Sequence, residues 1–443
     1  MNFQISKNIL KKIRRNIFSR EQGAYVTYAC SFGNQTVSEL QQITGSLFSK
    51  GKFSPRILFN DGLIGIKSID MRSLCEIVFR LKTAKDVYLV LDEAHVGGPK
   101  DLIRRMGKIP YELIFNPGSS ISVKAYSSDS ILYHEGLIKE LIGKELAGAG
   151  FHDNAPFDHF LRARLKKNHF TLEIALGGTP LYKRGYKKSL KTPAPLAEHA
   201  AASLIRESFD WMETEIIPNR IFIPFSGGGT LGFETISYLA DIPLFTWGRN
   251  FSMEELVCYP KSSMNNSVKK MTVELKGRLE RISQVKTLFM DIQEDRIKET
   301  HMNIEGFESA LQKTAGIGYD GFSVVHGDIF STSVADWFYE GRDVFVPLNP
   351  PYGIRLSGEK GISPAFYGRV ASVISGLLNM DLKKVFGFCL LPDEKAKKCF
   401  LKKLAGFSVR DEKITLGGRS LLAVYFKTCR NQPVSPASCG SGR

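Results

Sequence analysis

Short apolar runs alternate with helical patterns over the first part of the chain, as expected of small α+β units. Apolar residues recur on one helical face between positions 37 and 48, and they alternate strictly with polar ones from 170 to 176. The predicted elements are strands at 24–30, 87–91, 121–126 and 170–176 and helices at 37–48 and 71–80.

After Pro195 the pattern changes to strands that alternate with helices, which is typical of a doubly wound, mostly parallel sheet. A glycine turn and a helix at 230–240 follow the first of these strands. The predicted strands are 221–225, 286–290, 322–325, 343–348, 384–391 and 420–427. The sequence therefore predicts an α/β fold whose C-terminal part is a doubly wound, mostly parallel sheet that follows a smaller α+β region.

The 443 residues are too many for one ordinary core, so several domains are expected. The predicted parts are a basic N-terminal arm at 1–23, an α+β region at 24–178, a basic linker at 179–200, the α/β domain at 201–430 and a disordered tail at 431–443. Residues 1–20 contain no acid, and they fit an RNA-binding arm or a targeting segment. No stretch approaches the roughly 18 apolar residues of a membrane span, so no membrane association is expected.

Seven scattered cysteines show no metal-ligand spacing. We expect them to be reduced thiols in a cytoplasmic protein without a bound metal. The pattern does not define an oligomeric state, and a monomer is the working expectation.

Sixty Lys and Arg residues against 45 Asp and Glu give a net charge of +15, which favours a polyanionic partner. Basic and aromatic residues adjoin one another in the predicted linker. Most charge runs are simply solvated loops, but this one lies at a domain boundary, so we expect it to contact RNA. The residues predicted for this contact are Lys183, Arg184, Tyr186, Lys187 and Lys188.

The glycine turn 224–230, with the sequence Pro-Phe-Ser-Gly-Gly-Gly-Thr, lies at a strand end, where open α/β sheets bind ligands. Its glycines allow a ligand to approach the backbone closely, and the start of the next helix favours a carboxylate. No Gly-Lys-Ser/Thr follows, so it is not a Walker loop. Dinucleotide binding stays open for this turn alone. Asp291, which ends the next strand, suits ribose hydroxyls, and a helix N-cap is an equally good interpretation.

The third feature is Asn349-Pro350-Pro351-Tyr352, directly after the strand at 343–348. Two prolines stiffen the backbone and direct the Asn amide and a carbonyl toward one point. The tyrosine ring offers a face on which a base can stack. This combination points to a catalytic site rather than a plain turn. His326 is a candidate base, but a lone histidine at a strand end is more often structural.

These motifs, with HGDIF at 326–330 and NPPYGIRL at 349–356, resemble class I methyltransferases of exocyclic amino groups. Segments 79–91, 101–115, 177–204, 250–260 and 416–427 are similar to the THUMP-domain RNA guanine-N2 methyltransferases that act on bacterial large-subunit (23S) ribosomal RNA. The resemblance covers about residues 24–428. It implies a ferredoxin-like and THUMP RNA-binding region in front of a Rossmann-like class I methyltransferase domain.

The resemblance further implies S-adenosyl-L-methionine as cofactor and large-subunit ribosomal RNA as partner. Asn349 and Pro350 would hold the target amine, Pro351 would complete the motif, and Tyr352 would stack on the base. The residues implied at the cofactor are Pro224, Phe225, Ser226, Gly227, Gly229 and Thr230 at the methionine moiety, Asp291 at the ribose, Ile292, Asp328 and Ile329 at the adenine, and Asn349.

Two positions depart from the family pattern. Ile223 stands where an acid usually precedes Pro-Phe, and Ala197 stands where a basic residue usually follows Ala-Pro-Leu. The open alternatives are a tRNA guanine-N2 or DNA adenine-N6 methyltransferase of the same architecture, and a non-catalytic RNA-binding ribosome-assembly factor.

Overall fold

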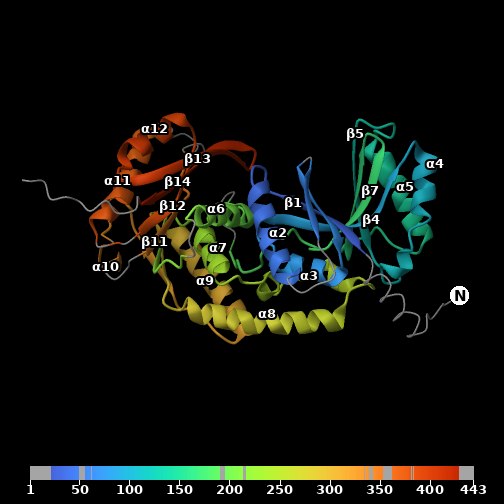
Figure 1. Cartoon of the computed structure of the whole chain (residues 1–443), viewed down its shortest axis with the longest axis horizontal. Helices are drawn as coiled ribbons and strands as arrows, with labels where there is room; N and C mark the ends of the chain where they lie inside the picture. Colours follow the sequence, from blue (N-terminus) through green and yellow to red (C-terminus); the bar gives the residue numbers. More distant parts are fainter. Residues whose placement is uncertain are drawn as a thin grey trace, which may run out of the picture.

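The computed structural model describes residues 21–48, 55–60, 62–189, 195–212, 216–333, 335–338, 343–352, 362–380, 382 and 384–428. Residues 1–20 of the expected N-terminal arm and the tail expected at 431–443 lie outside these residues. The described chain forms two seven-stranded sheets, one from each half of the sequence (Figure 1).

The first sheet is mixed, with the strand order β2-β3-β1-β4-β7-β6-β5. Its strands are β1 (Gln22–Tyr28), β2 (Arg56–Asn60), β3 (Leu63–Ile69), β4 (Ala84–His95), β5 (Ile121–Ser128), β6 (His159–Lys166) and β7 (His169–Ala175). Its helices are α2 (Gly33–Phe48), α3 (Met71–Arg80), α4 (Pro99–Met106) and α5 (Glu135–Gly148), with a short η1 (Tyr111–Leu113). One apolar core joins these helices to a single face of the sheet.

The second sheet has the order β10-β9-β8-β11-β12-β14-β13, in which β10 to β12 are parallel and β13 and β14 form an antiparallel hairpin at the edge. Its strands are β8 (Arg220–Pro224), β9 (Lys286–Asp291), β10 (Phe322–His326), β11 (Asp343–Leu348), β12 (Lys384–Leu391), β13 (Phe407–Leu416) and β14 (Arg419–Thr428). Its helices are α6 (Glu198–Asp210), α7 (Thr230–Leu239), α8 (Lys261–Arg281), α9 (Glu294–Ala315), α10 (Ala335–Phe338), α11 (Pro364–Gly376) and α12 (Glu394–Lys403), with short 3₁₀ turns η2 (Leu244–Trp247), η3 (Ser252–Glu255) and η4 (Leu377–Asn379).

Helices cover both faces of this second sheet, with α6 to α9 in one core and α10 to α12 in the other. A strand covered on both faces needs a continuous apolar run rather than an alternating one. β12 has this composition and is buried from Val385 to Leu391. The predicted doubly wound sheet is therefore confirmed.

The predicted domain boundary near residue 201 does not separate the two cores, because residues beyond it also pack in the first core. Most of the buried apolar side chains between Leu244 and Met271 belong to the first core, whereas Trp247 belongs to the second, although the whole segment lies inside the predicted α/β domain. Helix α8 continues beyond it and runs beneath both halves in Figure 1. The segment between α7 and β9 thus ties the second sheet to the first.

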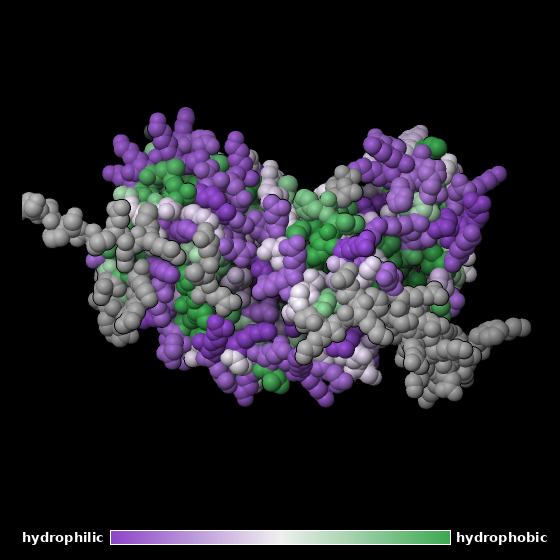
Figure 2. All heavy atoms as spheres, in the orientation of Figure 1, coloured by the Kyte–Doolittle hydropathy of each residue, from purple (hydrophilic) through white to green (hydrophobic). Residues whose placement is uncertain are grey.

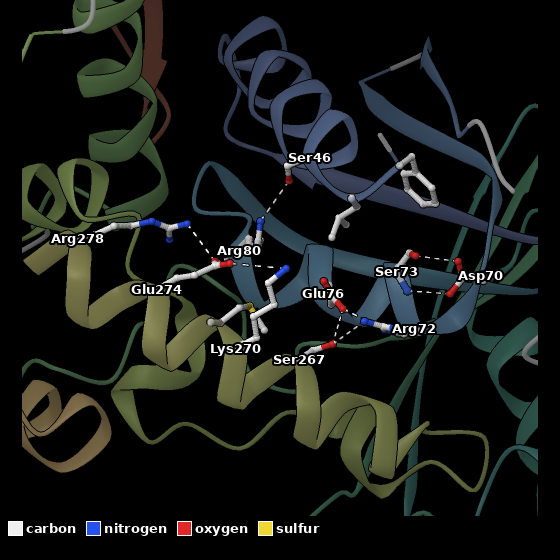
Figure 3. Close-up of a pocket in the computed structure, with 13 residues that line it drawn as sticks. Ser46, Asp70, Arg72, Ser73, Glu76, Arg80, Ser267, Lys270, Glu274 and Arg278 are labelled. Carbon is white, nitrogen blue, oxygen red and sulfur yellow. Dashed lines mark hydrogen bonds and ion pairs between the residues drawn. The ribbon is translucent and has the colours of Figure 1, made fainter. Parts of the chain in front are cut away.

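Figure 3 shows where α8 faces α3 across a polar pocket of about 480 Å³. Ser267 donates to the buried Glu76 at 2.5 Å, and Glu274 accepts from Arg278 at 3.2 Å and lies 3.7 Å from Arg80. Each acidic side chain drawn in Figure 3 accepts a hydrogen bond from another residue of the same cluster. We therefore interpret the pocket as part of the contact between the two halves of the protein and not as a ligand site. Figure 2 shows the two lobes separated by a notch on the opposite side. Within the described residues, no helix is both long and apolar enough to cross a membrane.

Candidate active site

The carboxyl ends of β8, β9, β10 and β11 meet at a cavity of about 580 Å³. Strand order reverses between β8 and β11, and ligands of open α/β sheets bind outside the strands at such a point. The predicted site residues that line the cavity are Phe225, Ser226, Gly227, Thr230, Asp291, Ile292, Asp328, Ile329, Asn349, Pro350, Pro351 and Tyr352. Residues from four separated segments are thus brought to one place.

The glycine turn bends sharply over the end of β9. The backbone N–H groups of Phe225 and Ser226 both donate to the carbonyl of Met290, at 3.0 and 2.9 Å. Phe225 adopts a φ of 91°, and a bulky residue holds such a left-handed value at a cost of roughly 1–3 kcal/mol. Gly227 has a φ of 52°, and a Cβ there would meet no atom within 4 Å. The turn is therefore strained, and at Gly227 its backbone is open to the cavity.

Helix α9 holds the turn from behind. The Thr300 hydroxyl donates to the Gly227 carbonyl at 2.8 Å, and the Asn303 amide donates to the Gly228 carbonyl at 3.0 Å. Both side chains are fully buried. Gly229 ends the turn with a φ of 87°, and a Cβ there would lie 2.6 Å from the Phe233 ring. Nothing in the α9 sequence marks those two residues, so this support could not be predicted from it.

Asp291 fastens the next strand end to the turn. Its two carboxylate oxygens accept from the backbone N–H groups of Gly227 at 2.9 Å and Gln293 at 3.0 Å. Asp291 therefore braces the turn, as well as lining the cavity beside the exposed Ile292. Asp328 is half-buried at the next strand and accepts from the Phe330 N–H at 3.0 Å.

The Asn-Pro-Pro-Tyr segment forms the opposite wall. The Tyr352 hydroxyl donates to Asn349 Oδ1. The Tyr367 hydroxyl, from α11, donates to the Pro351 carbonyl at 2.9 Å. Burial raises the pKa of Tyr367, so this hydroxyl stays protonated and keeps donating at neutral pH. The segment is therefore pinned from α11, a helix that sequence analysis did not connect with the site.

Several lining residues were not predicted. They come from the segment before α6, from α9, and from α11 and the residue two positions before it, and they are Pro195, Leu196, Arg296, Ile362, Phe366 and Arg369. No motif surrounds them, so only the apolar face of α11 and the Ala-Pro-Leu resemblance could have drawn attention to them. Pro224 and Gly229, which were predicted, are absent from the lining and shape the turn instead.

The predicted RNA contact needs correction at Arg184 and Tyr186. Both are buried, with Arg184 in an ion pair with Glu234 at 3.0 Å and Tyr186 donating to the same carboxylate at 3.0 Å. Their side chains cannot reach RNA from these positions. Aromatic and basic residues alternate here because they fill and neutralise an interior.

Lys187 pairs with Glu198 at 2.8 Å and is mostly covered. Lys183 and Lys188 remain exposed. The stretch from 181 to 189 thus packs against the α/β domain, and two of its five predicted contacts are open to solvent on the protein surface.

The two residues that depart from the family pattern, Ile223 and Ala197, do not line the cavity. Ile223 is buried in the core between β8 and its neighbours, and it is absent from the lining. Ala197 precedes α6 without lining the cavity either. His326 Nε2 donates to the Ile292 carbonyl, 3.0 Å away, and His326 is absent from the lining. Among the described residues no group of three or more His, Cys, Asp or Glu is arranged to hold a metal ion.

No protein-family model matches the sequence. Curated relatives carry the name ribosomal RNA large subunit methyltransferase K/L. The one from Psychromonas ingrahamii is 25% identical over 292 residues, which cover 62% of this chain and 35% of that protein. The one from Shewanella loihica is 21% identical over 337 residues, covering 71% and 44%. The chain thus spans less than half the length of these relatives.

Solved structures match nearly the whole chain. A protein from Listeria monocytogenes assigned as an N6-adenine-specific DNA methylase has a TM-score of 0.69 at 18% identity, covering 92% of this chain and 96% of that one. A protein assigned as a methyltransferase, complexed with SAH, has a TM-score of 0.69 at 18% identity, covering 94% and 100%. TrmN from Thermus thermophilus has 0.60 at 16%, covering 93% and 100%. The chain therefore has the α/β fold of these methyltransferase structures, as predicted.

Proposed function

We propose that this protein is an S-adenosylmethionine-dependent RNA methyltransferase that methylates the exocyclic N2 of a guanine in large-subunit (23S) ribosomal RNA. The observation that carries the proposal is the meeting of the strained glycine turn, Asp291, Asp328 and the Asn349–Tyr352 segment around one cavity at the switch point of the sheet. A chain that only binds RNA would have no need of this arrangement.

The cavity fits the cofactor. Ser226 Oγ is buried without a hydrogen-bond partner among the described residues, and Gly227 leaves open space beside the turn. The N-terminus of α7, which follows the turn, favours the carboxylate of a methionine moiety. Asp291 and Asp328 offer carboxylate lone pairs for ribose hydroxyls and an adenine amino group. The cofactor would supply an already activated methyl group, so orientation matters more than acid or base strength.

Asn349 and Pro350 would orient the acceptor. The amine of guanine is conjugated with its ring and is a poor nucleophile. Asn349 Oδ1 and the Pro350 carbonyl can accept its two protons, which favours a pyramidal nitrogen as the bond to the methyl group forms. The Tyr352 hydroxyl occupies Asn349 Oδ1 in this structure. The incoming amine would replace that hydroxyl as the donor, while the ring stacks on the base, which must leave its own stack to enter.

The names of the relatives support the choice of substrate. They are ribosomal RNA large subunit methyltransferases, and their similarity extends over 62–71% of this chain in the two cases described above. The net charge of +15 fits a nucleic-acid partner. We assign the first sheet and its helices to a ferredoxin-like and THUMP RNA-binding region in a protein of the cytoplasm.

The test is nucleoside mass spectrometry of ribosomal RNA and tRNA from cells with and without the gene. We expect one N2-methylguanosine to disappear from the large-subunit RNA and to return with the wild-type gene but not with Asn349→Ala. The variant protein should keep its cofactor affinity, because Asn349 lines the cavity without holding the turn. Turnover retained by Asn349→Ala would overturn the mechanism.

The same experiment decides between the alternatives. One solved structure of this fold is named as a DNA methylase, and tRNA is the other nucleic acid among the alternatives, so both are analysed alongside ribosomal RNA. A change confined to tRNA guanosine or DNA adenine would move the substrate and leave the chemistry. No change in any of them, with no binding of S-adenosylmethionine by calorimetry, would favour a non-catalytic RNA-binding factor.

A further inference from the structure

An arginine on the rim of the cavity has no polar partner within the described chain. Arg369 lies on α11, is exposed and lines the cavity. Its guanidinium carbon lies 3.9 Å from the centroid of the Phe330 ring. No hydrogen bond or ion pair is recorded for it among the described residues. An arginine stacked by its face on a ring keeps the N–H groups at its edge free.

The ring beneath this arginine is fixed by packing. Phe330 meets Phe366 edge to face with centroids 5.5 Å apart, and Phe366 in turn lies 6.0 Å from Phe225 on the glycine turn. Phe330 follows Asp328, whose carboxylate accepts from the Phe330 N–H. The guanidinium is thus supported on a rigid aromatic wall, and less of its side-chain entropy remains to be lost on binding.

The charges around the cavity single out this residue. The other basic side chain in the lining, Arg296, pairs with Glu299 at 3.1 Å. Asp291 accepts from two backbone N–H groups and Asp328 from one. Among the described lining residues, Arg369 is therefore the cation without an acidic partner, and it is exposed to solvent.

We propose that Arg369 binds a backbone phosphate of the nucleotide whose base enters the cavity. The inference rests on the proposed function, because a base drawn out of its stack carries its sugar and flanking phosphates to the rim. The planar guanidinium fork matches two phosphate oxygens at once. The anionic end of the cofactor has its own site at the N-terminus of α7, so the cation at the rim is left for the RNA.

The test compares Arg369→Gln with the wild-type enzyme on an in vitro transcript of 23S ribosomal RNA. We expect the KM for RNA to rise roughly three- to tenfold, with kcat and the affinity for S-adenosylmethionine little changed. The slope of log affinity against log salt concentration should become shallower by about 0.7–0.9, as for one lost phosphate contact. Arg369→Lys keeps the charge but loses the fork, so its KM should fall between the two.

Arg281→Gln is the matched control, since Arg281 is an exposed arginine at the end of α8 and does not line the cavity. It should leave both KM and salt slope unchanged. An unchanged KM in Arg369→Gln would overturn the inference. So would a loss of cofactor affinity without a change in the KM for RNA, which would assign Arg369 to the cofactor. If the wild-type enzyme transfers no methyl group to this RNA, the proposed function fails first and the inference falls with it.

Discussion

Replacing Arg184 with methionine separates a structural role for the linker from a role in binding RNA. Arg184 is 2% exposed, and one guanidinium nitrogen lies 3.0 Å from the Glu234 carboxylate. The same group donates to the carbonyl oxygens of Leu181 at 2.7 Å and Lys82 at 2.6 Å. It therefore joins the linker, the connection between α3 and β4, and helix α7 at one buried point.

The expected loss of stability is large. Without Arg184, the buried Glu234 still accepts from the Tyr186 hydroxyl but has lost its cation. Removing one partner of a buried ion pair costs about 3–5 kcal/mol. For a domain of this size that corresponds to a fall in Tm of roughly 6–20 °C. Burial already raises the pKa of Glu234, and losing the cation raises it further. A raised acid pKa gives stability that is present at low pH and lost as the pH rises, so the defect should be larger at about pH 8 than at about pH 5.5.

Thermal denaturation at the two pH values measures this loss, and filter binding of ribosomal RNA at a temperature where both proteins are folded measures the affinity. We expect a lower Tm with unchanged RNA affinity. Adding Glu234→Gln to Arg184→Met should recover part of the Tm, because no buried charge is then left unpaired. A variant with an unchanged Tm and weaker RNA binding would refute the structural account and restore Arg184 to the RNA interface.

Two further predictions follow from buried contacts. In Gly228→Ala the new Cβ would lie 2.9 Å from Glu299 Oε1, so we expect cofactor affinity to drop about tenfold by calorimetry and Tm to fall slightly. Gly277→Ala, in the exposed interior of α8 with open space around it, should leave cofactor affinity unchanged and raise Tm slightly. Burial raises the pKa of Asp86 to about 7, which makes the wild-type protein lose up to about 4 kcal/mol of stability as the pH rises from about 4 through 7. Asp86→Asn should therefore gain Tm relative to the wild type between about pH 5.5 and pH 8; a constant difference would contradict the assigned shift.

Much of the second sheet could be predicted because its strands are buried on both faces. A strand such as β12 must be apolar along its length. Helix α7 begins at Thr230, directly after the glycines of the turn, so its start could also be predicted. The candidate site could also be predicted, because the carboxyl ends of parallel strands meet at one edge of the sheet and the motifs directly follow these strands. Helix α3 was also predicted over its full range, Met71–Arg80, because its apolar face and its Asp70 cap are both local signals.

The remaining features depend on contacts that are distant in sequence. Arg184 belongs to a basic stretch that looks solvated, and only the position of Glu234, 50 residues later, makes it a buried residue. Most of the segment from Leu244 to Met271 packs in the first core, which no local pattern could indicate. Phe366 and Arg369 reach the cavity from a helix beyond the Asn-Pro-Pro-Tyr motif, and neither residue type carries a signal of its own.

The missing acid at position 223 can be weighed against what holds the turn. Ile223 points into the core on β8, so an acid there would add charge beneath the turn and not to the lining described above. The shape of the turn depends on other groups: Thr300 and Asn303 donate to its carbonyls from α9, and Asp291 accepts its Gly227 N–H. These contacts are independent of residue 223. Isoleucine at position 223 therefore removes one charge and leaves the turn in place. For this reason the proposed function includes binding of S-adenosylmethionine, and calorimetry with this cofactor is the measurement that tests it.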